Sequence, residues 1–195
     1  MDLVSLRHLT LICALTLAAT AIQPAAAQSA PASAQSSANA NANETPAARP
    51  ADVSSMNAII KAVYDVISGP KGQERDWDRM RSLFVPGARL ISARTGKDGA
   101  TTAHVMSVED YIRLGGPMLQ KDGFFEREAH RTEDRYGNIA QVFSTYESRH
   151  STDAEPFQRG INSFQLLFDG QRWWVVTIYW QGETPSFPIP KQYGG

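Results

Sequence analysis

Cysteine is almost absent from this sequence, which limits how the fold can be stabilised and which catalytic and metal-binding groups it can use. The single cysteine is Cys13, close to the N-terminus. One thiol cannot form a disulfide within the chain, and residues 28–195 contain no cysteine nucleophile and no cysteine metal ligand. Leu11 and Ile12 precede Cys13, where lipoprotein attachment needs a small residue, so a lipid anchor is not expected. The stability of the fold must therefore come from packing.

The sequence also lacks the common catalytic and nucleotide-binding motifs. It contains no glycine-rich dinucleotide or phosphate loop, no His-Glu-x-x-His and no Gly-x-Ser-x-Gly. After residue 27 the histidines are His104, His130 and His150, widely spaced on different predicted elements. A metal site needs several clustered ligands, so we expect neither a metal site nor a cofactor.

The sequence also has no large excess of positively or negatively charged residues. The chain has 19 Lys and Arg against 20 Asp and Glu, a net charge of −1, and no basic run stands out. Nucleic acids and anionic membrane surfaces select basic patches. We therefore expect no nucleic-acid partner and no membrane partner for the mature protein.

The first 27 residues are typical of a secretory signal peptide. Arg7 and His8 form a short basic region, residues 9–22 form an apolar run too short to span a bilayer comfortably, and residues 25–27 are a small-residue cleavage site. An uncleaved membrane anchor is the alternative. The sequence predicts an exported protein, periplasmic or secreted, cleaved after Ala27.

Two further regions follow the predicted signal peptide. Residues 28–51 consist almost wholly of Ala, Ser, Asn, Gln and Pro without periodic apolar positions. Such a segment buries too little surface to offset the entropy of ordering it, so we predict a disordered linker. Residues 52–195 are long enough for one domain with one core.

Three amphipathic helices are predicted in the first part of the domain. Residues 56–67 carry apolar side chains at helical spacing, and residues 77–84 do so after Asp76, a candidate N-cap. The third helix begins at Ser107 with a variant capping box, and we expect residues 115–117, Gly-Gly-Pro, to bend or end it.

Strands dominate the rest of the domain. Residues 89–93 form a short strand candidate, residues 96–102 read as a loop, and two long strands are predicted over 124–135 and 139–150. Helices followed by a run of antiparallel strands indicate the α+β class, with the helices on one face of a curved sheet.

A hairpin over residues 157–181 is the strongest local signal. Two runs rich in aromatic and β-branched residues flank Asp169-Gly170, a favoured hairpin turn. Neither run alternates cleanly between apolar and polar residues. Both faces of this hairpin therefore need cover, one from helices and the other from a second sheet, a second subunit or another part of the chain.

This layout resembles the nuclear transport factor 2-like superfamily, and within it the SnoaL-like branch. The resemblance covers residues 52–195 and rests on two elements. One is Asp-Trp-x-x-Met-x-x-Leu-Phe-x-Pro-Gly-Ala at 76–88, and the other is Ile-Asn-Ser-Phe…Asp-Gly…Trp-Val-Val at 161–176. It implies a cone-like α+β fold in which three N-terminal helices pack on a curved antiparallel sheet, mixed at the edge. The superfamily contains isomerases and dehydratases beside members that only bind or assemble.

The resemblance also implies an apolar pocket inside the cone and a homodimer through the convex face of the sheet. Residues expected to line the pocket and to bind a small apolar or aromatic molecule are Tyr64, Tyr146, Asn162, Phe164 and Trp180. On the convex face Phe143, Ile161 and Leu167 are candidate dimer-interface residues. The alternative is that the C-terminal tail, residues 184–193, folds back and covers that face.

Two polar residues invite comparison with ketosteroid isomerases, which this superfamily includes. Asn162 stands where those enzymes place a donor to the developing oxyanion, and Tyr64 lies near their oxyanion tyrosine. Each also has a structural reading, as a strand amide and as a core tyrosine. The isomerases keep a carboxylate base at the end of the first short strand, but residues 90–93 contain no Asp or Glu. Their proton shuttling is therefore in doubt for this chain.

His130 is the candidate acid–base residue, because imidazole titrates near neutral pH. Strand alternation places Glu126, Glu128 and His130 on one face. That face either lines the cavity, where His130 and a glutamate form an acid–base pair, or faces solvent. A bulge in the strand would exchange the two faces.

Three functions remain open from the sequence. The first is non-catalytic binding of a small apolar or aromatic ligand. The second is a cofactor-independent lyase or isomerase that uses His130 as acid or base. The third is a homodimeric assembly module whose cone is filled by its own side chains.

Overall fold

The fold is taken from a computed structural model, which describes residues 45–195. The predicted signal peptide, Cys13 and most of the predicted linker lie outside the described residues. Ala48 packs against the core and Pro50 begins the first helix, so described structure precedes residue 52 by a few positions. Among residues 45–195, no helix is both long enough and apolar enough to cross a membrane.

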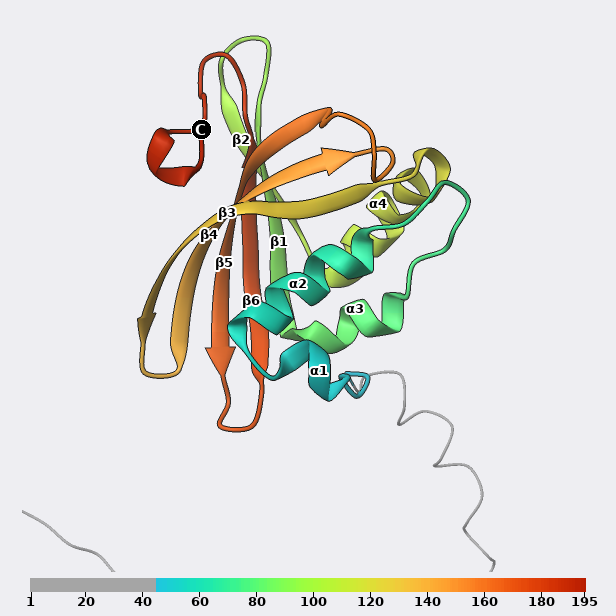
Figure 1. The fold of residues 1–195 in the computed structure, drawn as a ribbon, viewed down its shortest axis with the longest axis vertical. Helices are drawn as coiled ribbons and strands as arrows, with labels where there is room; N and C mark the ends of the chain where they lie inside the picture. The colour runs from blue at the N-terminus through green and yellow to red at the C-terminus, as the bar shows by residue number, and fades with distance from the viewer. Residues whose placement is uncertain (1–44) are drawn as a thin grey trace, which may run out of the picture. The chain divides into compact units, whose positions relative to one another are not determined.

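A six-stranded mixed sheet forms the centre of the fold (Figure 1). The strands are β1 (Phe84–Thr95), β2 (Thr101–Met106), β3 (Phe125–Tyr136), β4 (Ile139–Arg149), β5 (Gln158–Phe168) and β6 (Trp173–Gly182). Their order across the sheet is β2-β1-β6-β5-β4-β3, and neighbouring strands are antiparallel except β1 and β6, which are parallel. This is the α+β fold expected from the sequence, with the mixed pairing next to the edge strand.

The helices gather on one side of the sheet, and the C-terminal turn lies on the other (Figure 1). They are α1 (Pro50–Val53), α2 (Met56–Ile67), α3 (Trp77–Leu83) and α4 (Val108–Asp122), and the tail ends in the 3₁₀ turn η1 (Lys191–Tyr193). Side chains cap three of these helices at their N-termini. The caps are Ser55 on α2, Asp76 on α3, and Ser107 with Asp110 in a capping box on α4.

The helix and strand boundaries differ from the prediction at three places. Strand β1 extends well beyond residues 89–93, and part of the predicted loop 96–102 belongs to the edge strand β2. Most of β2 is exposed and lacks apolar alternation, so local sequence carries little signal for it. Helix α4 continues through Pro117, which lies on its exposed side. Of the two predicted alternatives for residues 115–117, an end of the helix is therefore wrong, and a bend stays a prediction.

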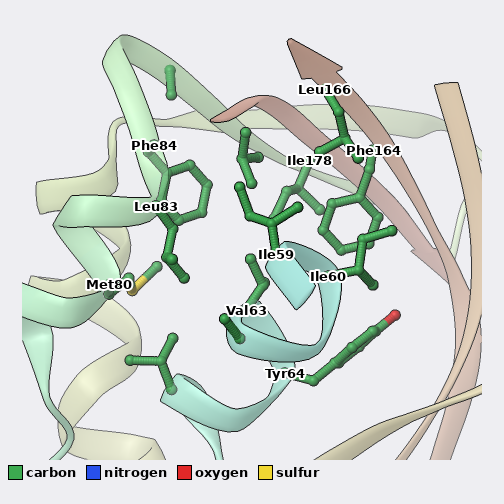
Figure 2. Close-up of a cluster of buried hydrophobic side chains, with 14 of the residues drawn as sticks. Ile59, Ile60, Val63, Tyr64, Met80, Leu83, Phe84, Phe164, Leu166 and Ile178 are labelled. Carbon is green, nitrogen blue, oxygen red and sulfur yellow. The ribbon is translucent and has the colours of Figure 1, made fainter. Parts of the chain in front are cut away.

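The core lies between α2, α3 and the concave face of the sheet (Figure 2). Helix α2 and the region around α3 contribute Ile59, Ile60, Val63, Met80, Leu83 and Phe84, and the strands contribute Phe164, Leu166 and Ile178. The alternation of β4 and β5 places most of their buried residues on this face, as predicted for Tyr146 and Phe164.

A buried arginine joins the end of α2 to the end of α4. The guanidinium of Arg75 donates to the carbonyl oxygens of Ile67 (2.9 Å), Gly69 (2.7 Å), Leu119 (3.0 Å) and Gln73 (2.5 Å). The residue is only 6% exposed, and its bonds within the described residues go to backbone carbonyls. Two of these carbonyls are at helix C-termini, which favour a cation.

The C-terminal tail folds back on the convex face of the sheet, which was one of the two predicted alternatives. The ring of Tyr193 packs on Phe143 with ring centroids 5.4 Å apart, and the Thr145 hydroxyl donates to the Tyr193 carbonyl at 2.6 Å. Tyr179 on the same face stays 46% exposed. The tail thus covers part of the face, and dimerisation through the remaining part stays a prediction.

Candidate functional site

A cavity of about 290 Å³ opens between the concave face of the sheet and helices α2 to α4. Its walls are mostly apolar, and it approaches the lower end of the size range of ligand sites, roughly 300–1,000 Å³. Four of the five predicted ligand residues line it: Tyr146, Asn162, Phe164 and Trp180. The cone is therefore not filled by its own side chains.

The fifth predicted residue, Tyr64, lies at the rear of this cavity. It lines a separate polar groove of about 710 Å³ between α2 and β3, and Glu126 lines both spaces. The Tyr64 hydroxyl is hydrogen-bonded to Ser144 Oγ at 2.6 Å and accepts from Asn162 Nδ2 at 3.1 Å. Its ring packs edge-on against Phe164.

A glycine makes room for Tyr146. Gly160 on β5 pairs with Tyr146 on β4, and both residues are buried on the concave side. A Cβ atom at Gly160 would collide with the Tyr146 ring and hydroxyl and with the Gln181 carbonyl. Glycine at this position therefore lets the tyrosine ring lie over the neighbouring strand and line the cavity.

Glu126 supplies a carboxyl group to the cavity. Ser148 Oγ donates to its Oε2 at 2.7 Å, and Asn162 Nδ2 lies 3.3 Å from its Oε1. Burial raises the pKa of Glu126 from 4.5 to about 7, and the two hydrogen bonds oppose this rise. A carboxyl group with this pKa can both accept and release a proton near neutral pH.

Two phenols lie close to this carboxyl group. Tyr111 and Tyr146 line the same cavity, and their hydroxyls form no hydrogen bond to any other described residue. Burial raises the pKa of both phenols, and the charge of Glu126 adds to the effect. Both hydroxyls thus keep their protons at neutral pH and can donate a hydrogen bond to a ligand.

His130 lies on the opposite face of the sheet from this cavity. Glu128 pairs with Tyr146 and His130 pairs with Thr145, so Ala129 is an extra residue in β3. This bulge separates His130 from the two glutamates, and the predicted shared face is wrong. His130 is exposed, and its Nε2 lies 3.1 Å from the Gln192 carbonyl oxygen in the tail.

Sequence reasoning missed the role that Glu126 could play by itself. From the sequence, Glu126 is only a candidate partner of His130, and the expected place for a carboxylate base is residues 90–93 on the first strand. The structure brings a carboxyl group into the cone from β3 instead. The available signal was a glutamate following Phe124 and Phe125 in a strand with polar neighbours, and it did not reveal which way the side chain pointed.

Within residues 45–195, no group of three or more His, Cys, Asp or Glu side chains is placed to hold a metal ion. The polar groups in the cavity are one carboxyl, hydroxyls and amides, which suit hydrogen bonding and proton transfer. This donor set could orient a ligand that carries one or two polar atoms on an apolar frame.

Comparison with known proteins finds likenesses among solved structures. No model of a known protein family matches the sequence, and no curated protein matches it either. The chain is similar to a protein of unknown function with a cystatin-like fold from Nostoc punctiforme, at 10% identity, a TM-score of 0.49, and coverage of 68% of this chain and 90% of the other. It is also similar to a candidate dehydratase of the nuclear transport factor 2-like family from Streptomyces avermitilis, at 11% identity, a TM-score of 0.49, and coverage of 68% and 96%.

A third similar structure is a nuclear transport factor 2-like protein of unknown function from Silicibacter pomeroyi. Its identity is 14% and its TM-score 0.45, with coverage of 67% of this chain and 94% of the other. Likeness at this level concerns the fold alone.

Proposed function

We propose that the protein is a cofactor-independent isomerase or lyase that moves a proton on a small, mostly apolar carbonyl compound. The observation that carries this proposal is the Glu126 carboxyl group, half-buried at the wall of an apolar cavity and with its pKa raised to about 7. Perturbed carboxyl groups in apolar clefts are typical of acid–base sites. Glu126 replaces His130 as the proposed acid or base.

The proposed chemistry uses groups that the cavity provides. The Glu126 carboxylate removes a proton from the carbon next to the carbonyl group. The electron pair of the broken C–H bond forms a C=C bond, and the π pair of the carbonyl group moves onto its oxygen to give an enolate. The hydroxyl of Tyr146 or Tyr111 donates a hydrogen bond to that oxygen as its charge develops. Where a further C=C bond adjoins the enolate, return of the proton from Glu126 to the far end of the conjugated system shifts the double bond and gives an isomer. Where the next carbon bears a leaving group, the enolate expels it with its electron pair, Glu126 returns the proton to the leaving group, and an alkene forms.

Exchange of protons for deuterons in a simple ketone tests the proposal without knowledge of the natural substrate. Cyclohexanone in D₂O exchanges the protons next to its carbonyl group, and proton NMR follows their loss. We expect the wild-type protein to accelerate this exchange and Glu126→Gln to lower the acceleration by at least about 100-fold. Glu133→Gln is the matched control, because Glu133 lies on the same strand and outside the cavity.

The result also separates catalysis from binding. Equal exchange rates for wild type and Glu126→Gln would overturn the proposed chemistry. Non-catalytic binding of a small apolar or aromatic ligand is the second candidate, supported by the mostly apolar lining of the cavity. In that case native mass spectrometry would detect a carried ligand in both proteins while neither accelerates exchange. An assembly module with a filled cone is disfavoured by the open cavity.

Export to the periplasm or the medium, and a homodimer through the convex face, remain proposals from the sequence. Native mass spectrometry of the mature protein measures the subunit count in the same experiment. A single-chain mass at micromolar concentration would contradict the dimer.

A further inference from the structure

A chain of hydrogen bonds leads from Glu126 to an ion pair in the polar groove behind the cavity. Building on the proposed function, we propose that Ser144 and Tyr64 are positioning residues that hold the Asn162 amide nitrogen toward Glu126 and so poise this acid for proton transfer. The chain runs from Arg131 through Glu128, Ser144, Tyr64 and Asn162 to Glu126.

The ion pair at one end fixes the direction of the chain. Arg131 donates to both oxygens of Glu128, at 2.9 Å from Nε and 2.7 Å from Nη2. A carboxylate only accepts hydrogen bonds, so Ser144 Oγ, 2.6 Å away, must donate its hydrogen to Glu128 Oε1. Ser144 is fully buried, and its single hydrogen is thereby committed.

The donor and acceptor in each of the other hydrogen bonds follow from which hydrogens are still free to be donated. Because the Ser144 hydrogen is committed, Tyr64 must donate to Ser144 Oγ, 2.6 Å away. The Tyr64 oxygen then accepts, and Asn162 must present its nitrogen to it, at 3.1 Å. The second hydrogen on the same nitrogen is directed to Glu126 Oε1 at 3.3 Å. Asn162 thus gives both amide hydrogens to the protein.

This arrangement changes the roles that the sequence assigned to two residues. The Tyr64 hydrogen points away from the cavity, and the Asn162 hydrogens are both in use. Neither residue is free to donate to a ligand. Their effect on chemistry passes instead through Glu126, whose charged form the Asn162 nitrogen stabilises.

Ser144→Ala tests the proposal without removing a charge. Without Ser144 Oγ, the Asn162 side chain is the remaining side-chain hydrogen-bond partner of the Tyr64 hydroxyl. The hydroxyl can donate its hydrogen to Asn162 only if the amide turns its oxygen toward Tyr64. That oxygen then also faces Glu126 in place of the nitrogen. We expect the titration midpoint of Glu126, followed by carbon NMR with labelled glutamate, to rise by about one pH unit. The midpoint of the pH dependence of cyclohexanone exchange should rise by the same amount.

A second substitution distinguishes positioning from a general packing effect. In the double variant Ser144→Ala with Tyr64→Phe, no hydroxyl requires an acceptor from Asn162, so the Glu126 midpoint should return toward the wild-type value. A packing effect would instead grow with the second substitution. Glu133→Gln is the control, because Glu133 lies 3.6 Å from Arg131 and outside the chain. The titration midpoint of Glu126 in the Glu133→Gln variant should equal the wild-type midpoint.

The wild-type protein provides a measurement that does not depend on a folded variant. Both side-chain amide protons of Asn162 should exchange with water more slowly than those of the exposed Gln171. An unshifted midpoint in folded Ser144→Ala, no return in the double variant, or fast exchange at Asn162 would each overturn the proposal. Failure of the proposed function is a separate result, in which wild type does not accelerate exchange but Glu126 titrates as described.

Discussion

Glu126 and His130 lie on the same strand, β3, and their side chains occupy opposite faces of the sheet. Glu126 is hydrogen-bonded to Ser148 and lines the cavity, whereas His130 contacts the C-terminal tail at Gln192. The bulge at Ala129 produces this separation, since it adds one residue between the two pairing positions. The acid–base role inside the cone is therefore proposed for the glutamate.

The position of His130 leads to a prediction about activity. His130→Ala should leave the rate of cyclohexanone exchange within about twofold of wild type, because the imidazole does not reach the cavity. The substitution removes the contact to Gln192, so amide exchange in residues 191–195 should become faster. Exchange kinetics and hydrogen–deuterium mass spectrometry measure the two effects. A large loss of activity would contradict the assignment of the acid to Glu126.

Glu126 also makes stability depend on pH. In the folded state burial raises the pKa of this carboxyl from 4.5 to about 7. Below pH 4.5 the carboxyl is protonated in both states, and its contribution to stability is fully present. As the pH rises toward 7 the unfolded chain loses the proton first, so the folded state becomes relatively less stable. Above pH 7 both states are ionised and the loss is complete.

Glu126→Gln removes this titration and gives the measurement its reference. Between pH 4.5 and 8 the wild-type free energy of unfolding should fall relative to that of the variant by up to about 3 kcal/mol. Urea unfolding of both proteins at several pH values measures the difference. Parallel curves for the two proteins would show that Glu126 titrates alike in the folded and unfolded states.

Arg75 should contribute strongly to stability although it has no described carboxylate partner. Arg75→Met removes the guanidinium donor from the carbonyl oxygens of Ile67, Gly69 and Leu119, and the Gly69 oxygen keeps a second donor, the Phe124 N–H at 3.0 Å. We expect a loss of about 3 kcal/mol. Arg113→Ala is the control: Arg113 is exposed and pairs with Asp110 one turn away, so its loss should cost less than about 0.5 kcal/mol. Similar unfolding midpoints for the two variants in urea would contradict the prediction.

Two adjacent glycines in α4 should respond to alanine in opposite ways. A Cβ atom at Gly116 would lie 2.9 Å from Trp77 Cζ2, whereas one at Gly115 would come no closer than 3.8 Å to Tyr111. Both substitutions gain helix propensity, of roughly 0.5–1 kcal/mol. Gly115→Ala should therefore stabilise the fold, and Gly116→Ala should destabilise it by about 1–3 kcal/mol. Thermal unfolding followed by circular dichroism compares the two.

Local patterns in the sequence were sufficient for the hairpin and for helix α2. The hairpin forms around Asp169, whose side chain accepts from the backbone of Gln171 and Arg172, and α2 buries the apolar side chains that recur at helical spacing. The hairpin and the helix depend on neighbours in the chain, so a local pattern records them. The places of Tyr146 and Phe164 in the cavity wall were implied instead by the resemblance to the nuclear transport factor 2-like superfamily.

Other features depend on partners far away in the chain. Strand β2 exists because it pairs with β1, and its own residues are mostly exposed. The bulge at Ala129 arises from the register between β3 and β4, and Pro117 is tolerated because it lies on the outer side of α4. The spacing of residues in β2 does not distinguish it from a loop. The spacing around Ala129 is that of a regular strand, and the spacing around Pro117 is that of a helix end.

The order of residues along the chain thus established helices on one face of a curved sheet, because burial of apolar surface follows periodicity that short segments already contain. The resemblance to a known superfamily implied that the helices and the sheet enclose an apolar cone. Which polar groups meet inside that cone was decided by strand register and by the one extra residue in β3. A shift of one position moves every following side chain to the other face. For this reason Glu126 meets Asn162 in the cavity while His130 contacts the tail.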